Sequence, residues 1–288
     1  MKIELVPFDR RTGEAYAAVE SNVGDRHWML AAAEACNRRG LRPHELHAFA
    51  RDTARIYAWA IVVRTSDQSA TNATSEPLIK VAAAHRSEIG DDAWTRDTRE
   101  FLEAAYLSTD NPYAGSGKGG GEAEWEAGRR VIAAAIPTPG TFLDTCCANG
   151  LLMESMAAWA GVEPYGLDIS EHLVALARQR LPHWADRLWA GDARTWQPPR
   201  RFDYVYVLPE VTRPHLRAEM VAHLLENAVE PGGRLITGQY LSASNDDLDE
   251  PPIWEQRAAW GFDVAGTALK LRTPDPRGSR TEIAWITH

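Results

Sequence analysis

From residue 122 onward the sequence alternates between short apolar runs and longer stretches in which apolar residues recur at helical spacing. An apolar run of about four to eight residues is typical of a buried strand, and each run here leads through a turn toward a helical stretch. Strand, turn and helix repeated in this order build crossover connections, which give a parallel sheet with helices on both faces. The predicted strands cover residues 141–144, 164–168, 188–191, 203–208 and 234–240, and the predicted helices cover residues 122–136, 151–159, 171–180 and 214–228.

The end of the chain follows a different pattern. Residues 262–271 and 281–287 are two strand-like runs joined by Arg-Thr-Pro-Asp-Pro-Arg-Gly, with no helical stretch between them. Two strands joined in this way pair antiparallel. We therefore predict an α/β fold with a doubly wound, mostly parallel, seven-stranded sheet and an antiparallel edge at the C-terminus.

The first 107 residues lack strong strand patterns, and Pro43 suits the first turn of a helix. Apolar residues recur at helical spacing in four stretches, residues 26–38, 44–63, 78–87 and 94–106. We therefore expect a helical N-terminal cap or extension over residues 1–107.

A glycine-rich segment, residues 108–121, separates the N-terminal part from the sheet-forming part, residues 122–288. Five glycines lie within the seven residues from Gly115 to Gly121. Such a segment is either a flexible hinge between domains or a lid whose glycines let the backbone approach a ligand. Tyr113, within the same segment, is a candidate to cover that ligand.

Charge and residue types favour a cytoplasmic chain without a membrane anchor. The formal net charge is −9, which disfavours nucleic acid as a partner, because a phosphate backbone attracts basic proteins. The N-terminus carries charges and a proline where a signal peptide needs an apolar run, and residues 56–63 are far short of the ~20 that a membrane span requires. Cys36, Cys146 and Cys147 lack the spacing of a zinc site, so no metal is predicted.

Three acidic residues follow the first three predicted strands: Asp144, Asp168 and Asp192. Each is 24 residues from the next, which is one strand–helix unit. In an open parallel sheet, ligands bind beyond the carboxyl ends of the strands. A single Asp after a strand is most often a helix cap or a turn residue. Three acids in the same register indicate instead that they face one crevice.

Short motifs surround these acids in a fixed order. Residues 143–150, Leu-Asp-Thr-Cys-Cys-Ala-Asn-Gly, place an acid before a loop of small residues. Residues 165–169, Tyr-Gly-Leu-Asp-Ile, end a strand on an acid, and residues 190–193, Ala-Gly-Asp-Ala, carry the third acid. A fourth strand and the turn into a fifth lie at residues 202–210 and 229–236. In order and spacing these motifs resemble the class I S-adenosylmethionine-dependent methyltransferases.

The resemblance implies S-adenosyl-L-methionine as the cofactor, with Asp168 on the ribose hydroxyls and Asp192 on the adenine edge. A ribose diol suits a carboxylate, and the ammonium group of the methionine end suits Asp144. A dinucleotide would bring a pyrophosphate that Asp144 repels, and the G-x-G-x-x-G pattern is absent. The predicted cofactor-binding residues are Tyr113, Asp144, Cys146, Ala148, Gly150, Asp168, Ile169, Asp192, Ala193 and Leu208.

The first loop departs from the family at two positions, because Cys146 and Ala148 stand where glycine is usual. Ala148 is the milder change. Cys146 is expected to be the costlier one, since a side chain there either crowds the cofactor or requires a negative φ. We expect cofactor binding to survive both changes.

Glu210 and His215 follow the fourth strand and are the candidate catalytic residues. An oxygen or nitrogen acceptor benefits from a base whose pKa lies near the working pH, and proximity supplies much of the remaining acceleration. The alternative interpretation is that both are ordinary surface residues near the start of a helix.

The predicted function is S-adenosylmethionine-dependent methyl transfer to a small-molecule acceptor, of the kind found in bacterial specialised metabolism. An enclosed, largely apolar pocket under a helical cap would favour such an acceptor. One alternative is a methyltransferase acting on RNA or protein, which would need a basic face on the cap. Another is a protein that binds S-adenosylmethionine without transferring the methyl group. The acceptor atom and the oligomeric state are not predicted.

Overall fold

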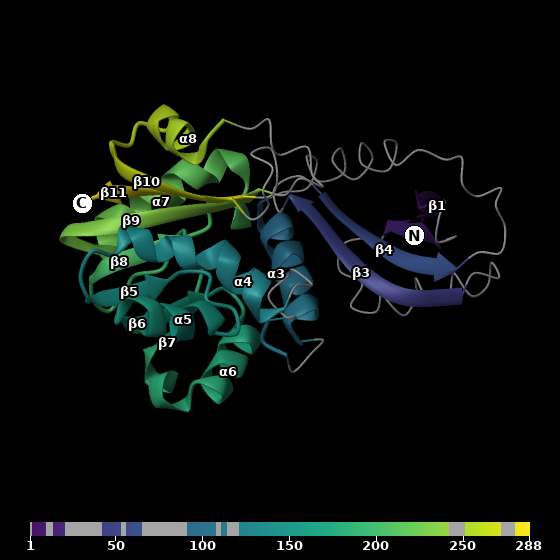
Figure 1. Cartoon of the computed structure of the whole chain (residues 1–288), viewed down its shortest axis with the longest axis horizontal. Helices are drawn as coiled ribbons and strands as arrows, with labels where there is room; N and C mark the ends of the chain where they lie inside the picture. The colour runs from purple at the N-terminus through teal and green to yellow at the C-terminus, as the bar shows by residue number, and fades with distance from the viewer. Residues whose placement is uncertain are drawn as a thin grey trace. The chain divides into compact units, whose positions relative to one another are not determined.

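The computed structural model describes residues 2–9, 14–20, 42–52, 56–64, 91–107, 111–113, 121–241, 251–271 and 280–288. The chain divides into two compact units, Met1–Thr98 and Arg99–His288 (Figure 1). None of the described helices is long and apolar enough to cross a membrane.

The second unit is built on a seven-stranded sheet in the order β10-β11-β9-β8-β5-β6-β7. Its strands are β5 (Thr141–Asp144), β6 (Glu163–Asp168), β7 (Leu188–Ala190), β8 (Phe202–Val207), β9 (Val229–Leu241), β10 (Val264–Leu271) and β11 (Arg280–Thr287). The strands from β5 to β9 pair in parallel, whereas β11 pairs antiparallel with both β9 and β10. The predicted α/β class, with its mostly parallel sheet and antiparallel C-terminal edge, is confirmed.

The strand order reverses beside β5. The chain proceeds outward from β5 to β6 and β7, then crosses back to place β8 on the other side of β5. Such a reversal separates the connections at the carboxyl ends of two neighbouring strands and leaves a crevice there. The candidate site therefore lies beyond Asp144, at the end of β5.

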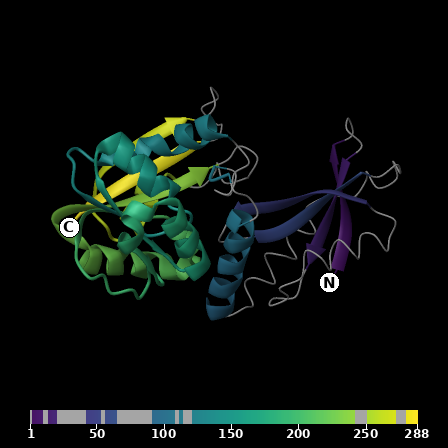
Figure 2. The same cartoon turned by 90° about the horizontal axis from the view of Figure 1, so that it is seen from below.

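Helices cover both faces of this sheet (Figure 2). They are α4 (Glu122–Arg129), which continues as the 3₁₀ helix Arg130–Ala135, α5 (Leu151–Ala160), α6 (Glu171–Arg180), α7 (Arg217–Ala228) and α8 (Ile253–Ala259). Alternation along β8 divides the core, because Tyr204 and Tyr206 pack in a cluster with α4 and α5. Val205 and Val207 pack in a second cluster with α7. Each face of the sheet thus has its own apolar core.

The first unit contains strands where helices were expected. β1 (Lys2–Asp9), β2 (Glu14–Glu20), β3 (Arg42–Asp52) and β4 (Ile56–Arg64) form an antiparallel sheet in the order β1-β2-β4-β3. The predicted helix over residues 44–63 is wrong, because β3 and β4 pair side by side across that stretch. Ile56, Tyr57, Trp59 and the Ile61-Val62-Val63 run are β-branched or aromatic, and such residues favour strands. The same apolar positions also fit a helical spacing, which misled the sequence interpretation.

The remaining N-terminal predictions have mixed outcomes. The helix expected over residues 94–106 is confirmed as α3 (Asp91–Leu107). Those expected over residues 26–38 and 78–87 lie outside the described residues. A wholly helical N-terminal part is ruled out by the four strands, and its role as a cap stays a prediction.

Candidate functional site

The loop after β5 is held between the two neighbouring parallel strands. Thr145 donates its backbone N–H and its Oγ1 hydroxyl to the carbonyl oxygen of Tyr206 on β8, at 3.0 and 2.8 Å. Two residues later, Cys147 donates its N–H to the carbonyl of Leu167 on β6, at 3.0 Å. The loop therefore bridges β8 and β6 across the end of β5 and is fixed by backbone groups on both sides.

Asp168, at the end of β6, is hydrogen-bonded through both carboxylate oxygens. Its Oδ2 accepts the N–H of Ala148 and its Oδ1 accepts the N–H of Ser170, each at 2.9 Å. Burial raises its pKa from 3.8 to about 6, although the two backbone hydrogen bonds oppose the rise. These two hydrogen bonds fix the plane of the carboxylate. Each carboxylate oxygen keeps a second lone pair that can accept a hydrogen bond from a ligand.

Asp144 is the more deeply buried of the two acids, with 1% of its surface exposed. Its Oδ1 accepts the N–H of Cys146 at 3.2 Å. Burial raises its pKa from 3.8 to about 7, the charge of Asp168 raises it further, and the charge of Arg129 lowers it. Two buried carboxyls thus lie within electrostatic reach of each other, an arrangement that a cationic ligand would relieve.

The unusual backbone conformation of the loop falls on Ala148 and not on Cys146. Ala148 has φ of +43°, and it is the one non-glycine residue with a positive φ in the described part of the chain. A left-handed conformation costs an L-residue roughly 1–2 kcal/mol. We expected Cys146 to be the costlier substitution for glycine. For the backbone this is wrong, because Ala148 and not Cys146 adopts the positive φ that favours glycine.

Cys146 is half-buried at the junction of β5 and β8. Burial raises the pKa of its thiol well above the usual range, and the charges of Asp144 and Asp168 add to the effect. A hydrogen bond from the backbone of Leu208 acts in the opposite direction. Cys146 and Leu208 are therefore neighbours, and the thiol stays protonated and unreactive at neutral pH. No cluster of metal-ligating side chains occurs among the described residues.

Gly150 begins α5 in a left-handed conformation, with φ of +78°. A Cβ at this position would lie 2.7 Å from Cδ1 of Leu181. The left-handed backbone favours glycine here, and any other residue would also require the end of the Leu181 side chain to move.

Asp192 follows β7 and is paired with a near neighbour. Its Oδ1 accepts the N–H of Arg194 at 2.9 Å, and its Oδ2 lies 2.6 Å from Nη2 of the same arginine. A ligand would share these oxygens with Arg194. The side chain of Ala193 is buried in the core cluster beside α7, so a ligand contact there would use its backbone N–H. Ile169, between Asp168 and the helix-capping Ser170, is half-buried.

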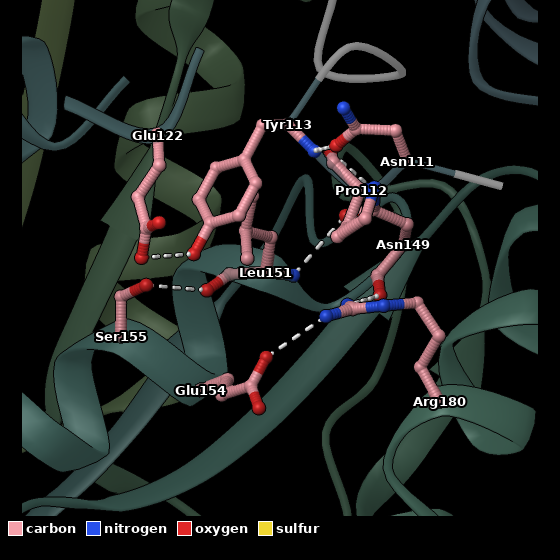
Figure 3. A network of polar contacts seen from close by, with 9 residues as sticks. All are labelled: Asn111, Pro112, Tyr113, Glu122, Asn149, Leu151, Glu154, Ser155 and Arg180. Atoms are coloured by element: carbon pink, nitrogen blue, oxygen red, sulfur yellow. Dashed lines mark hydrogen bonds and ion pairs between the residues drawn. The ribbon is translucent and has the colours of Figure 1, made fainter. Parts of the chain in front are cut away.

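Tyr113 is held against α4. Its hydroxyl donates to Oε1 of Glu122 at 2.9 Å, and its ring meets that of Trp125 edge-on at 6.0 Å between centroids. Asn111 supports the turn, because its Oδ1 accepts the N–H of Tyr113 at 3.0 Å (Figure 3). Both the hydroxyl and the ring of Tyr113 therefore contact α4.

Asn149 connects the loop after β5 to the described turn of the glycine-rich segment. Its Nδ2 donates to the carbonyl of Pro112 at 3.0 Å, and its Oδ1 accepts the N–H of Leu151 at 3.1 Å. The guanidinium of Arg180 donates to the backbone carbonyl of Asn149 and pairs with Glu154 at 2.8 Å (Figure 3). Within the glycine-rich segment, residues 111–113 and Gly121 are described, so the glycine run from 115 to 120 lies outside the described residues.

Residues 142–233 match the family model described as a methyltransferase domain. This stretch of the chain is similar to methyltransferase domains. The match runs from β5 into β9 and includes the three acids and the loop after β5. The resemblance to the class I S-adenosylmethionine-dependent methyltransferases is confirmed, and S-adenosyl-L-methionine is the cofactor of this enzyme class. No curated protein matches the chain.

Several solved structures are distantly similar to this chain, each at a TM-score below 0.5. N-methyltransferase NodS from Bradyrhizobium japonicum WM9, with S-adenosyl-L-homocysteine, is 15% identical at a TM-score of 0.44 and covers 66% of this chain and 98% of its own. The glycopeptide N-methyltransferase MtfA with sinefungin is 17% identical at 0.46, covering 57% and 87%. The [4+2]-cyclase SpnF is 15% identical at 0.48, covering 67% and 95%. No residue role is transferred from structures this distant.

The second unit contains a tyrosine pair that the sequence analysis missed. The hydroxyls of Tyr206 on β8 and Tyr240 on β9 lie 3.0 Å apart. The guanidinium carbon of Arg129 is 4.9 Å from the centre of the Tyr240 ring and 4.7 Å from that of Trp125. Burial raises the pKa of both tyrosines, so their hydroxyls stay neutral hydrogen-bonding groups.

Tyr106 on α3 reaches the same place. Its pKa is raised by burial and by the charges of Asp168 and Asp144, and lowered by the charge of Arg129. Tyr106 is therefore within electrostatic reach of both buried acids and of Arg129. Tyr240 lies at the end of β9, so it could have been predicted in the same way as the three acids, which were identified because they follow strands. Nothing in the sequence separates Tyr106 or Arg129 from other residues of an amphipathic helix.

The two candidate catalytic residues lie in short helical turns after β8. Glu210 is half-buried in the 3₁₀ helix Pro209–Val211, and His215 is exposed in the 3₁₀ helix Pro214–Leu216. The charge of Glu210 raises the pKa values of Tyr240 and of Arg257 on α8. Glu210 is therefore connected electrostatically to Tyr240 and to Arg257. The catalytic roles of Glu210 and His215 stay predictions.

Proposed function

We propose that the chain transfers the methyl group of S-adenosyl-L-methionine to a small-molecule acceptor. The observation that carries this proposal is the pair of buried carboxyls, Asp144 and Asp168, at the strand-order reversal. An ammonium group and a ribose diol would satisfy these two carboxylates, and the cofactor contains both.

The residues around the loop fit the remaining parts of the cofactor. Asp168 would accept hydrogen bonds from the ribose hydroxyls, because its plane is fixed by Ala148 and Ser170. Asp144 would pair with the ammonium group. Arg129 supplies a positive charge within electrostatic reach of Asp144, and would bind the carboxylate of the methionine end. A zwitterionic amino acid would thus meet one buried acid and one arginine of opposite charge.

Bound cofactor supplies an electrophilic methyl group on a sulfonium, and the chain's own residues must position the acceptor and take its proton. Glu210 is the group best placed to receive that proton, because it is half-buried and connected electrostatically to Tyr240. The Tyr206–Tyr240 hydroxyl pair would orient a polar acceptor atom. His215, exposed on its turn, would act only with an acceptor that extends toward the surface.

Asp168 offers a direct test of cofactor binding. Isothermal titration of S-adenosyl-L-homocysteine should show binding to the natural chain and a ten- to hundredfold weaker affinity for Asp168→Ala, as expected for a lost charge-assisted bond worth about 1.5–3 kcal/mol. Asp186→Asn, which changes an exposed acid, is the matched control and should bind like the natural chain. A natural chain that does not bind S-adenosyl-L-homocysteine would contradict the proposal.

The acceptor class is tested by supplying methyl-deuterated S-adenosyl-L-methionine with bacterial extract separated into small molecules, RNA and protein. Mass spectrometry should find the label in the small-molecule fraction. Label in RNA or protein would favour a macromolecular acceptor instead. Binding of the cofactor with no label in any fraction would favour a protein that binds without transferring.

A further inference from the structure

A buried arginine on α8 has two guanidinium nitrogens without a hydrogen-bond partner among the described residues. Arg257 on α8 is 1% exposed. Its Nε donates to Oγ1 of Thr237 on β9 at 3.1 Å, and its guanidinium carbon lies 4.1 Å from the centre of the Trp260 ring. Its Nη1 and Nη2 are both buried, with no hydrogen-bond partner among the described residues. A buried guanidinium whose N–H groups lack hydrogen bonds costs free energy, so Nη1 and Nη2 of Arg257 would be stabilised by a hydrogen-bond acceptor.

Arg217 and Thr212 also have buried polar atoms without a hydrogen-bond partner among the described residues. Arg217, at the start of α7, donates its Nε to the carbonyl of Thr212 at 3.3 Å. Its Nη2 and the Oγ1 of Thr212 are buried and also lack partners within the described ranges. Burial lowers the pKa of Arg257 to about 10, and the charge of Arg217 contributes to the decrease. Arg257, Arg217 and Thr212 are here called the arginine cluster.

The charges of the cluster indicate the kind of ligand. Within the described ranges, the charges that act on Arg257 are those of one further guanidinium, Arg217, and one acid, Glu210, whose charge raises the pKa of Arg257. The local sum is one positive charge, which complements a monoanion better than a dianion such as phosphate. The free end of a guanidinium offers two parallel N–H donors, and this spacing matches the two oxygens of a carboxylate.

We propose that the arginine cluster binds a carboxylate of the methyl acceptor, with Nη1 and Nη2 of Arg257 as the fork and Arg217 and Thr212 as additional donors. The identity of the ligand as a methyl acceptor rests on the proposed function, whereas the anion site itself does not. Glu210 connects the arginine cluster with the Tyr206–Tyr240 pair, because its charge raises the pKa values of both Arg257 and Tyr240. An acceptor anchored by its acid group would therefore present another part beside Glu210. The substrate class is a small carboxylic acid that carries a methylatable oxygen or nitrogen.

Arginine side-chain NMR with acetate as the probe tests this directly. The Nε–H of Arg257 is buried and hydrogen-bonded, so it should give a slowly exchanging resonance, which Arg257→Lys identifies by its loss. Acetate added at constant ionic strength should shift this resonance in a saturable manner, and phosphate should shift it at least tenfold less effectively. A resonance that responds equally to both anions, or to neither, overturns the proposal.

Arg217→Gln gives a second test that does not disturb α8, because Arg217 is half-buried at the start of a helix. It should weaken acetate binding at Arg257 about tenfold, the effect of one lost charge-assisted bond. Arg187→Gln, which removes a surface arginine paired with Glu163 at 3.0 Å, is the control and should leave acetate affinity unchanged. Equal affinity in the natural chain and Arg217→Gln would show that the cluster does not act as one site.

Titration of the same samples with S-adenosyl-L-homocysteine separates this proposal from the proposed function. Acetate binding without cofactor binding would uphold the anion site and refute the methyltransferase activity. Cofactor binding without acetate binding would refute the anion site alone. The sequence also places four acids, Asp246, Asp247, Asp249 and Glu250, just before α8. Changing these four to amides should leave acetate affinity unchanged, and a large increase would mean that the chain's own carboxylates occupy the fork.

Discussion

Replacing Asp144 with Asn should stabilise the ligand-free chain while weakening its affinity for cofactor. Asparagine has nearly the same shape, and its Oδ1 can still accept the N–H of Cys146. The change removes only the buried negative charge. It therefore separates what the carboxylate costs the fold from what it contributes to binding.

The rise of the Asp144 pKa from 3.8 to about 7 sets the size of the effect. At about 1.4 kcal/mol for each pKa unit, an ionised Asp144 destabilises the folded state by up to about 4 kcal/mol. Because the folded pKa is the higher one, this cost is absent below about pH 4 and develops as the pH rises to about 7. Some relaxation around the charge reduces it, so we expect Asp144→Asn to gain about 2–4 kcal/mol near pH 8 and clearly less near pH 5.

Urea unfolding of the natural chain and the variant, without cofactor and at both pH values, measures the gain. Isothermal titration with S-adenosyl-L-homocysteine measures the loss, which should be ten- to hundredfold near pH 8 for one ammonium–carboxylate pair. The natural chain should also lose up to about tenfold in affinity for each pH unit below about 7, since protonation of Asp144 competes with the ammonium group. The variant should show no such slope.

Two results would refute this reasoning. A variant that is less stable near pH 8 would mean that the carboxylate has a favourable partner in the fold. A variant that binds S-adenosyl-L-homocysteine as tightly as the natural chain, with the same pH dependence, would remove Asp144 from the cofactor site. Asp186→Asn, with its exposed acid, should leave both stability and affinity unchanged.

Three further predictions concern the loop and the segment before α4. Ala148→Gly should raise the free energy of unfolding by up to about 1 kcal/mol in urea titrations, because it relieves the left-handed strain but adds backbone entropy to the unfolded chain; a loss of stability would contradict this. Cys146→Gly should tighten cofactor binding or leave it unchanged, and a folded variant that no longer binds would reveal a role for the thiol. Hydrogen exchange across residues 108–121 should slow when S-adenosyl-L-homocysteine binds, and Asn149→Ala, which removes the bond to Pro112, should reduce that protection. Equally fast exchange with and without ligand would indicate a simple linker.

The sequence predicts those parts of the fold that are determined by residues close together along the chain. Each strand of the second unit is a short apolar run that leads to a turn and then a helix, so pattern and topology rules were sufficient from β5 to β9. Residues 171–180 became α6 without any shift of boundary, because Ser170 caps the helix through its side chain. The 3₁₀ helices, such as Arg130–Ala135, were not separable from the α-helix before them, since both share the same apolar spacing.

The N-terminal sheet was missed because its residues fit two periods at once. Along residues 56–63, alanines separate the larger apolar residues, so the stretch has no polar face to mark a strand alternation. A helix and a strand buried on both faces are then indistinguishable by pattern, and β-branched content is the better guide. The site shows the same limit, since Tyr106 and Arg257 reach it from helices whose relation to the sheet is fixed only by tertiary packing.

Three features of the second unit break rules that a merely stable fold would keep: the buried charge of Asp144, the left-handed conformation of Ala148, and the unpartnered fork of Arg257. Each costs free energy in the ligand-free chain, and the first and the third are relieved by different parts of the proposed reactants. An ammonium group neutralises Asp144, the loop that Ala148 shapes keeps Asp168 oriented for the ribose, and a carboxylate fills the fork. The free energy that Asp144 and Arg257 cost the fold is therefore recovered on binding. Cofactor and acceptor should for that reason stabilise the chain additively, because the groups that each one satisfies are different.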